Sequence, residues 1–251
     1  MEANIKTKKF GVGDLLVEAW RILIQEYKNI LMIVLCVNLP VNILLAVNSN
    51  ELLVKENGMQ FLGILIQILL SLITMLATLS IVVITDRAVE GQSLPWTDAI
   101  LQALSKWAKA IGTGILAGLI VLLGMVIFII PGVIFSVYYM FTTYVVVLRN
   151  ESGIDALSYS KSLVQGQWWR MFGIALAIGI IIAVVTMAVI IPLNLIVSLI
   201  SYNPYWSIIP TTLVSIVSAF SIITMVLLFL NTDYTYRVGK VENLTPPVTG
   251  E

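Results

Sequence analysis

The sequence contains no histidine, a single cysteine and few charged residues. Charged residues make up 11% of the 251 positions and hydrophobic residues 59%, whereas a typical soluble domain is about 25% charged and 45–50% apolar. The lone Cys36 excludes a disulfide within the chain, and without histidine a zinc site built from His and Cys has almost no ligands. A mean hydropathy of +0.99 indicates an integral membrane protein. The formal net charge is zero and gives no sign of a nucleic-acid partner, so we predict none.

The longest uncharged runs exceed one membrane crossing. As one helix rising about 1.5 Å per residue, the run from Ile111 to Leu148 would be nearly twice as long as the ~30 Å hydrocarbon core of a bilayer. Pro131 has no N–H to donate and Gly132 tolerates positive φ, so the pair predicts a tight turn between two spans. The next uncharged run also needs a turn, which Ser201 to Ser207 (SYNPYWS) would supply, and Pro192 is expected to kink or end the span before it.

We therefore predict an all-α integral membrane protein with six transmembrane helices. A single membrane domain covers residues 1–238, and residues 239–251 form a short cytoplasmic tail without regular structure. The predicted spans cover residues 30–47, 61–84, 111–130, 133–148, 172–191 and 208–230.

The basic residues predict the orientation of the chain. Of the 14 Lys and Arg residues, all except Lys55 fall on one side of the predicted membrane. By the positive-inside rule, both termini then lie in the cytoplasm.

Three amphipathic segments precede pairs of spans and are predicted to be helices at the cytoplasmic membrane surface, covering residues 11–28, 94–109 and 153–168. Asp14, Glu18 and Arg21 begin a polar stripe with steps of four and three along the first of them. The pattern returns from Asp98 and, more loosely, from Asp155, so the chain is interpreted as one surface helix plus a transmembrane hairpin, repeated three times. The candidate interfacial anchors are Trp20, Trp107, Trp168, Trp169 and Arg170.

Uncharged polar residues follow single faces of several predicted spans, and two asparagines flank Pro40 where a helix would bend. A mildly polar cavity for a lipid headgroup or another amphiphile would explain them. Alternatively, they only form hydrogen bonds between helices, each worth on the order of 0.6 kcal/mol. The candidate cavity residues are Asn38, Asn42, Gln67, Ser71, Thr74, Thr78, Tyr139, Thr143, Ser215 and Ser218. Small residues such as Gly114, Gly118 and Gly179 would permit close contact between helices.

The predicted spans contain no Asp, Glu, Lys, Arg or His. Because ionisable residues inside a membrane mark proton relays and ion pathways, this disfavours a proton-driven pump or a transporter of charged substrates. A membrane-surface enzyme usually needs a histidine, a carboxylate pair or a metal site. Asp14, Asp98 and Asp155 instead resemble residues that start helices. We predict no enzymatic activity, no cofactor and no metal site.

Two segments resemble a bacterial family of six-span membrane proteins. The matching elements are the Gly-Asp-Leu-Leu start with Ala19-Trp20-Arg21, Pro131-Gly132, Gly153 to Leu157, and the junction from Trp169 to Gly173. This family includes the membrane domain that precedes the catalytic domain of some glycerophosphodiester phosphodiesterases. The resemblance implies a bacterial cytoplasmic membrane and a relation to lipids, but the chain lacks the catalytic barrel, so no catalytic residue is carried over.

The leading functional prediction is a non-enzymatic membrane module that binds or moves a lipid-like or other amphiphilic molecule, with membrane lipids as its partners. The first alternative is a scaffold or immunity-type protein that holds a membrane protein partner on its surface helices. A membrane-embedded enzyme is the second alternative. The sequence leaves open the identity of the ligand, the oligomeric state and the direction of any transport.

Overall fold

The computed structural model describes the chain except for residues 1–9, 50–59, 201–205, 207 and 245–251. Within the described residues it is helical and contains no strand, which confirms the all-α prediction. The elements are α2 (Val12–Gln25), α3 (Tyr27–Ile33), the π-helix η1 (Val34–Asn38), α4 (Leu39–Ser49), α5 (Gln60–Val89), α6 (Trp96–Ile127), α7 (Ile129–Tyr138), α8 (Thr142–Arg149), α9 (Ile154–Val164), α10 (Trp168–Ile200) and α11 (Ile208–Leu244).

Six helical stretches in the described part of the chain are long and apolar enough to cross a membrane, as predicted. They cover Tyr27–Ala46, Phe61–Val89, Trp96–Ile127, Ile129–Arg149, Trp168–Leu199 and Ile208–Val238. Their outer ends expose large apolar side chains: Val126 is 76% exposed and Leu199 78%. Contiguous exposed apolar surface of this kind suits contact with lipid rather than water.

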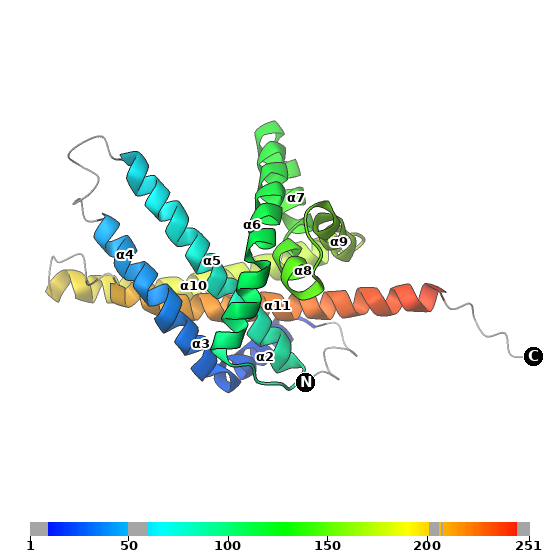
Figure 1. Ribbon diagram of the computed structural model, residues 1–251. Helices are drawn as coiled ribbons and strands as arrows, with labels where there is room; N and C mark the ends of the chain where they lie inside the picture. Colours follow the sequence, from blue (N-terminus) through cyan, green and yellow to red (C-terminus); the bar gives the residue numbers. More distant parts are fainter. Residues whose placement is uncertain (1–9, 50–59, 201–205, 207, 245–251) are drawn as a thin grey trace, which may run out of the picture.

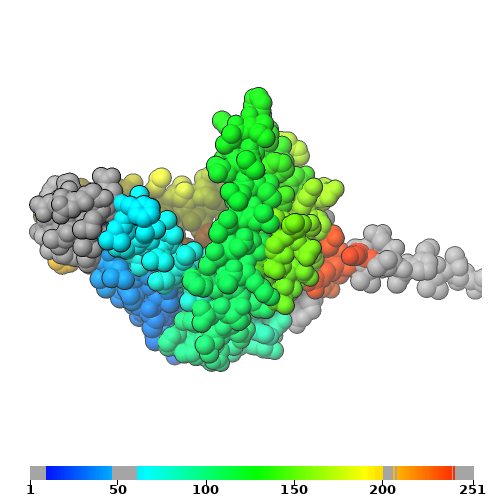
Figure 2. Space-filling model, turned by 45° about the horizontal axis from the view of Figure 1, so that its top comes forward, coloured from blue at the N-terminus to red at the C-terminus, as the bar shows by residue number. Residues whose placement is uncertain are grey.

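The long helices form three hairpins that diverge from a common base (Figure 1). The first consists of α4 and α5, the second of α6 and α7, and the third of α10 and α11. Figure 2 shows the second hairpin standing out from the rest of the molecule. The buried core lies at the base, where the second half of α5 meets the start of α6, α8, α9 and the second half of α11.

The turn between α6 and α7 lies at Phe128, not at Pro131-Gly132 as predicted. Phe128 is extended (φ −160°, ψ 148°), and Pro131 sits in the first turn of α7, where its missing N–H is not needed for the helical ladder. Gly132 matters for its size: a Cβ there would lie 2.2 Å from Met125 Cγ and 2.9 Å from the Met125 backbone nitrogen. A Cβ on Gly124 would likewise lie 2.8 Å from the Phe135 ring. The two glycines therefore let α6 and α7 cross closely.

The fourth span, predicted as one helix over 133–148, is broken between α7 and α8. The Ser160 hydroxyl of α9 donates to the Tyr138 carbonyl at 2.8 Å and accepts a hydrogen bond from the Phe141 amide at 3.2 Å. One buried side chain thus satisfies backbone groups on both sides of the break. It also fixes α9 against the end of the second hairpin.

The first span, predicted for 30–47, changes helical register in its middle. The Leu39 amide donates to the Val34 carbonyl, closing a π-helical turn directly before Pro40. Pro40 cannot donate and its ring would clash with a carbonyl one turn earlier, so the wider turn accommodates it within the helix. The bend expected at Pro40 therefore takes the form of a π-helix.

Other boundaries differ from the prediction. The surface segment 94–109 and the span 111–130 are one uninterrupted helix, α6. Pro192 lies inside α10, which continues to Ile200; such prolines are tolerated in membrane helices because neighbouring groups satisfy the freed carbonyl. The segment 239–251 is not wholly irregular, because α11 extends to Leu244. The turn at Ser201 to Ser207 falls, apart from Trp206, outside the described residues, as do Lys55 and residues 245–251.

The three predicted repeats have the same order of surface helix and spans, but the surface helix is joined to the following span differently in each. Asp14, Asp98 and Asp155 each lie in the first turn of a helix, as expected. However, α2 is separated from α3 only by Glu26, α6 has no break, and α9 and α10 are separated by a short turn. Internal repetition therefore stays a prediction.

Substitution of the crossing glycine tests this packing. Gly132→Ala is expected to lower the free energy of unfolding by about 1–3 kcal/mol, because the added methyl meets the Met125 backbone. Gly118→Ala is the matched control: its Cβ has no neighbour within 4 Å, so the change is expected to be neutral or slightly stabilising. Thermal unfolding in lipid nanodiscs compares them, and equal melting temperatures for the two variants would contradict the close crossing.

Candidate polar cavity and associated networks

A cavity of about 250 Å³ lies between the first hairpin and α11. It is lined by Asn38, Asn42, Thr74, Ala77, Thr78, Ile81, Ser215, Ser218 and Ile222. The lining residues come from η1, α4, α5 and α11, and all of them lie within membrane-spanning helices.

Helical spacing explains how these side chains reach the same space. Asn38 and Asn42 are one turn apart on either side of Pro40, and Thr74 and Thr78 are one turn apart on α5. Residues four apart share a helix face, so each pair presents its polar groups in one direction. The cavity forms where two such faces meet a third, on α11.

Most polar groups in the cavity already donate a hydrogen bond. The Asn42 side-chain amide donates to the Thr212 hydroxyl at 3.4 Å and so joins α4 to α11. The hydroxyls of Thr74, Thr78 and Ser215 donate to carbonyls of their own helices at 2.8, 3.3 and 3.2 Å. These hydroxyl oxygens therefore face the cavity mainly as acceptors.

Asn38 and Ser218 differ from the other lining residues. In the part of the chain that the structure describes, neither side chain has a hydrogen-bond partner. Apolar side chains complete the wall, and Ala77 and Ile81 are fully buried. The lining of the cavity is thus uncharged. It contains two polar side chains that make no hydrogen bond within the described residues, here called uncommitted, and buried apolar side chains.

The remaining candidate cavity residues lie elsewhere. Gln67 and Ser71 are exposed on α5, and the Ser71 hydroxyl donates to the Ile68 carbonyl at 2.7 Å. They lie in the first half of α5 (Gln60–Val89), before Thr74 and Thr78. Tyr139 and Thr143 flank the break between α7 and α8, and Tyr139 stacks on Phe135 with ring centroids 6.3 Å apart. This cavity therefore brings together part of the predicted set: Asn38, Asn42, Thr74, Thr78, Ser215 and Ser218.

The candidate anchors divide into exposed and packed residues. Trp20 is 58% exposed and Trp169 78%. Trp107 instead donates its indole N–H to the Leu72 carbonyl of α5 at 3.0 Å, and Trp168 stacks on Phe172. Arg170 donates to the Phe10 carbonyl at 3.0 Å, which ties the chain before α2 to α10. Trp107 and Arg170 thus serve internal packing.

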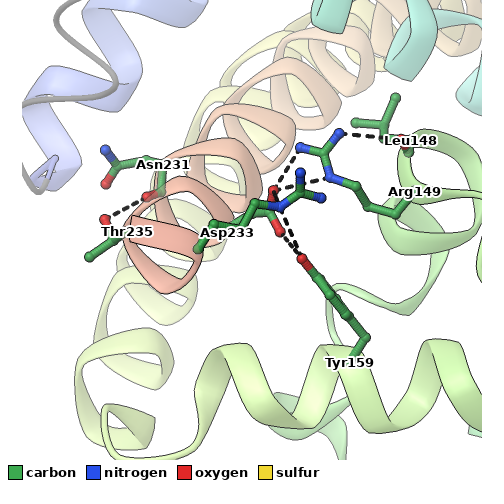
Figure 3. A network of polar contacts seen from close by, with 7 residues as sticks. Leu148, Arg149, Tyr159, Asn231, Asp233 and Thr235 are labelled. Atoms are coloured by element: carbon green, nitrogen blue, oxygen red, sulfur yellow. Dashed lines mark hydrogen bonds and ion pairs between the residues drawn. The ribbon is translucent and has the colours of Figure 1, made fainter. Parts of the chain in front are cut away.

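A buried ion-pair network at the base was missed by the sequence interpretation. Asp233 is 1% exposed, and its carboxylate accepts hydrogen bonds from Arg149 Nη2 at 2.7 Å and Nε at 3.0 Å. Arg237, one turn along α11, lies 3.1 Å from the same carboxylate, and the Tyr159 hydroxyl also donates to it. Figure 3 shows the Arg149 and Tyr159 side chains converging on Asp233. The network joins α8, α9 and α11.

Tyr159 acts in this network as a neutral donor. Burial raises the pKa of its hydroxyl, and the hydrogen bond to Asp233 raises the pKa further. The hydroxyl therefore keeps its proton at neutral pH. The sequence does contain one sign of this network, the oppositely charged residues Asp233 and Arg237 four positions apart. The predicted sixth span ended at Leu230, so this pair was left outside the predicted membrane-spanning helices.

A second missed cluster connects the first two hairpins. Glu26 is 2% exposed and accepts hydrogen bonds from the Asn29 side-chain amide at 2.8 Å and the Ser93 hydroxyl at 3.2 Å. Asn29 in turn accepts a hydrogen bond from the Trp96 amide at 3.3 Å, so it caps the start of α6 from another helix. Within the described ranges no three acidic or cysteine side chains gather in a way that could hold a metal ion.

The fold defines a multi-pass, α-helical membrane protein. A family of proteins described as a domain of unknown function (DUF7847) matches residues 99–238, more than half of the chain, and the chain belongs to this family. No curated protein and no solved structure matches the chain.

Removal of the central carboxylate tests the network at the base. Asp233→Asn is expected to lower the free energy of unfolding by about 3 kcal/mol, because it leaves two arginines without their buried partner. The control is Glu90→Gln, which breaks the pair with Arg87, where both side chains are at least 40% exposed. Exposed pairs contribute about 0–1 kcal/mol. Unfolding in mixed micelles measures both, and losses of similar size would show that the buried network is not what holds the base together.

Proposed function

We propose that the protein is a non-enzymatic module of the bacterial cytoplasmic membrane that binds or moves an amphiphile, with the polar head of the amphiphile in the cavity. The observation that carries this proposal is the pair of uncommitted polar side chains, Asn38 and Ser218, in a cavity between membrane-spanning helices. Asn38 is half-buried and Ser218 is exposed; in hydrocarbon, which offers no hydrogen bonds, such an unsatisfied amide or hydroxyl costs about 1–3 kcal/mol by protein mutational data. A bound polar head would recover this free energy.

The surroundings of the cavity support an amphiphile. On the same helices as the lining residues, Ile43 and Leu44 of α4 and Leu213 of α11 are exposed, at 41%, 52% and 39%, so the surface around the lining helices is apolar. An apolar tail outside the cavity would therefore stay in the hydrocarbon region while the head entered the cavity. None of the lining residues is an acid, a base or a thiol, so the cavity offers no general base that could activate its Ser and Thr hydroxyls as nucleophiles.

The distribution of basic residues supports an orientation with both termini in the cytoplasm. The base of the three hairpins, with the Asp233 network, would then lie at the cytoplasmic side. The resemblance to the membrane domain of glycerophosphodiester phosphodiesterases agrees with a lipid-related role for the membrane domain alone.

Native mass spectrometry of the protein, gently extracted from its host membrane, tests the proposal. The wild-type protein is expected to retain a defined lipid or amphiphile after delipidating washes. In the double variant Asn38→Leu/Ser218→Ala, retention is expected to fall about tenfold, which corresponds to about 1.4 kcal/mol. The matched control is Gln67→Leu/Ser71→Ala, which removes polar groups from the same hairpin outside the cavity and is expected to retain the adduct.

Three outcomes would contradict the proposal. The first is equal retention by the two double variants, which would place the amphiphile elsewhere. The second is a wild-type protein without any adduct. The third is a bare protein held by a stable protein partner, which would favour the scaffold alternative and direct attention to the surface helices.

A further inference from the structure

We propose that the head held in the cavity is small, uncharged and supplied with hydroxyl or amide hydrogen-bond donors, as in a glyceride. This inference rests on the proposed function, because it assumes that the cavity is the binding site. It adds the chemical class of the ligand, which follows from the charge, the hydrogen-bonding capacity and the volume of the cavity.

The cavity contains no charge to balance an ionic head. Its lining consists of Asn, Thr, Ser, Ala and Ile side chains. Neither of the nearest carboxylates further along the lining helices borders the cavity. At about 1.5 Å per residue, Asp86 lies about 7.5 Å beyond Ile81 on α5. By the same rise, Asp233 lies about 16 Å beyond Ile222 on α11, and it is already paired with Arg149 and Arg237. Moving a phosphate or an ammonium group from water into such a site would lose its hydration without an opposite charge in return. An uncharged head avoids this penalty.

The cavity has more acceptors than donors. The hydroxyl hydrogens of Thr74, Thr78 and Ser215 are used within their own helices. The Asn42 amide donates to Thr212, which leaves its carbonyl oxygen as an acceptor. The uncommitted donors are the Asn38 amide, the Ser218 hydroxyl and the second N–H of the Asn42 amide. A head with O–H or N–H groups matches this pattern, whereas a phosphodiester or a simple ester has only acceptors.

The volume limits the size of the head. Drug-sized ligands occupy pockets of about 300–1,000 Å³, and the cavity measures about 250 Å³. It would hold about eight waters at about 30 Å³ each. This space suits a glycerol-sized head, with the acyl chain outside the cavity in the hydrocarbon region.

Three probes with the same acyl chain and different heads test the inference. These probes are 1-oleoylglycerol, which has two hydroxyl donors, 1-oleoyl-lysophosphatidate, which is anionic, and methyl oleate, which has acceptors only. Each is titrated against the full chain by native mass spectrometry. The wild-type protein is expected to bind 1-oleoylglycerol at least about tenfold more tightly than either other probe. This preference is expected to disappear in Asn38→Leu/Ser218→Ala and to persist in Gln67→Leu/Ser71→Ala.

If the double variant misfolds, the milder single variant Ser218→Ala replaces it. This variant is expected to lose part of the preference for 1-oleoylglycerol. If lysophosphatidate or methyl oleate binds as tightly as 1-oleoylglycerol and its binding still depends on Asn38, the inference about the head is wrong while the proposed function stands. If no probe binds in a cavity-dependent way but the native adduct does, the inference also fails alone. If neither the probes nor the native adduct depend on the cavity, both proposals fail.

Discussion

The hydrocarbon of a bilayer offers no hydrogen bonds, so a chain that crosses it must satisfy its polar groups internally. This constraint accounts for the polar contacts of the structure. Hydroxyls along the long helices donate to carbonyls of their own helix, as Thr85 and Thr224 do. Where the helical ladder is interrupted between α7 and α8, Ser160 supplies both a donor and an acceptor. Against this background, the uncommitted Asn38 and Ser218 identify the cavity as the place where a further molecule fits.

The same environment explains why the hairpins are joined at one end. Lipid tails are as apolar as leucine, so helices in a membrane associate through close packing and hydrogen bonds rather than through the hydrophobic effect. These contacts are concentrated at the base, where Asp233 connects three helices and Glu26 connects the first two hairpins. Outward from the base the hairpins diverge from one another (Figure 1), although α6 and α7 still pack closely at Gly124 and Gly132 and a hydrogen bond still joins Asn42 to Thr212. The cavity lies between the first hairpin and α11.

The sequence predicted the helical class and six membrane-spanning helices, because long apolar runs are a local property of the chain. It did not predict where helices continue or break. The continuity of α6 and the break between α7 and α8 depend on contacts with other helices. At the break the contact comes from Ser160, which is distant in the sequence from Tyr138 at the end of α7. Pro131-Gly132 was assigned to the turn for its conformational freedom, whereas Gly132 is required by the proximity of Met125.

For the cavity, helical spacing predicted which polar residues share a face, but not which faces meet. Thr74 and Thr78 line the cavity together with residues of α11, whereas Ser71, on the same predicted stripe, does not line it. Predicted glycine contacts failed for the same reason: Gly114 and Gly118 have open space beside them, and the close crossing occurs at Gly124 and Gly132. Asp233 escaped notice because a charged residue just beyond an apolar run resembles a solvated end. Its burial depends on helices from other parts of the chain.

The most direct test of the central claim is an experimental structure of the protein in nanodiscs made from its host lipids. The account predicts continuous density with its compact end within hydrogen-bonding distance of the Asn38 amide and the Ser218 hydroxyl, and a tail along α4 and α11. A cavity closed by direct hydrogen bonds from Asn38 to α5 or α11, with no density between the helices, would contradict it. In that case the polar residues would serve only to join the helices.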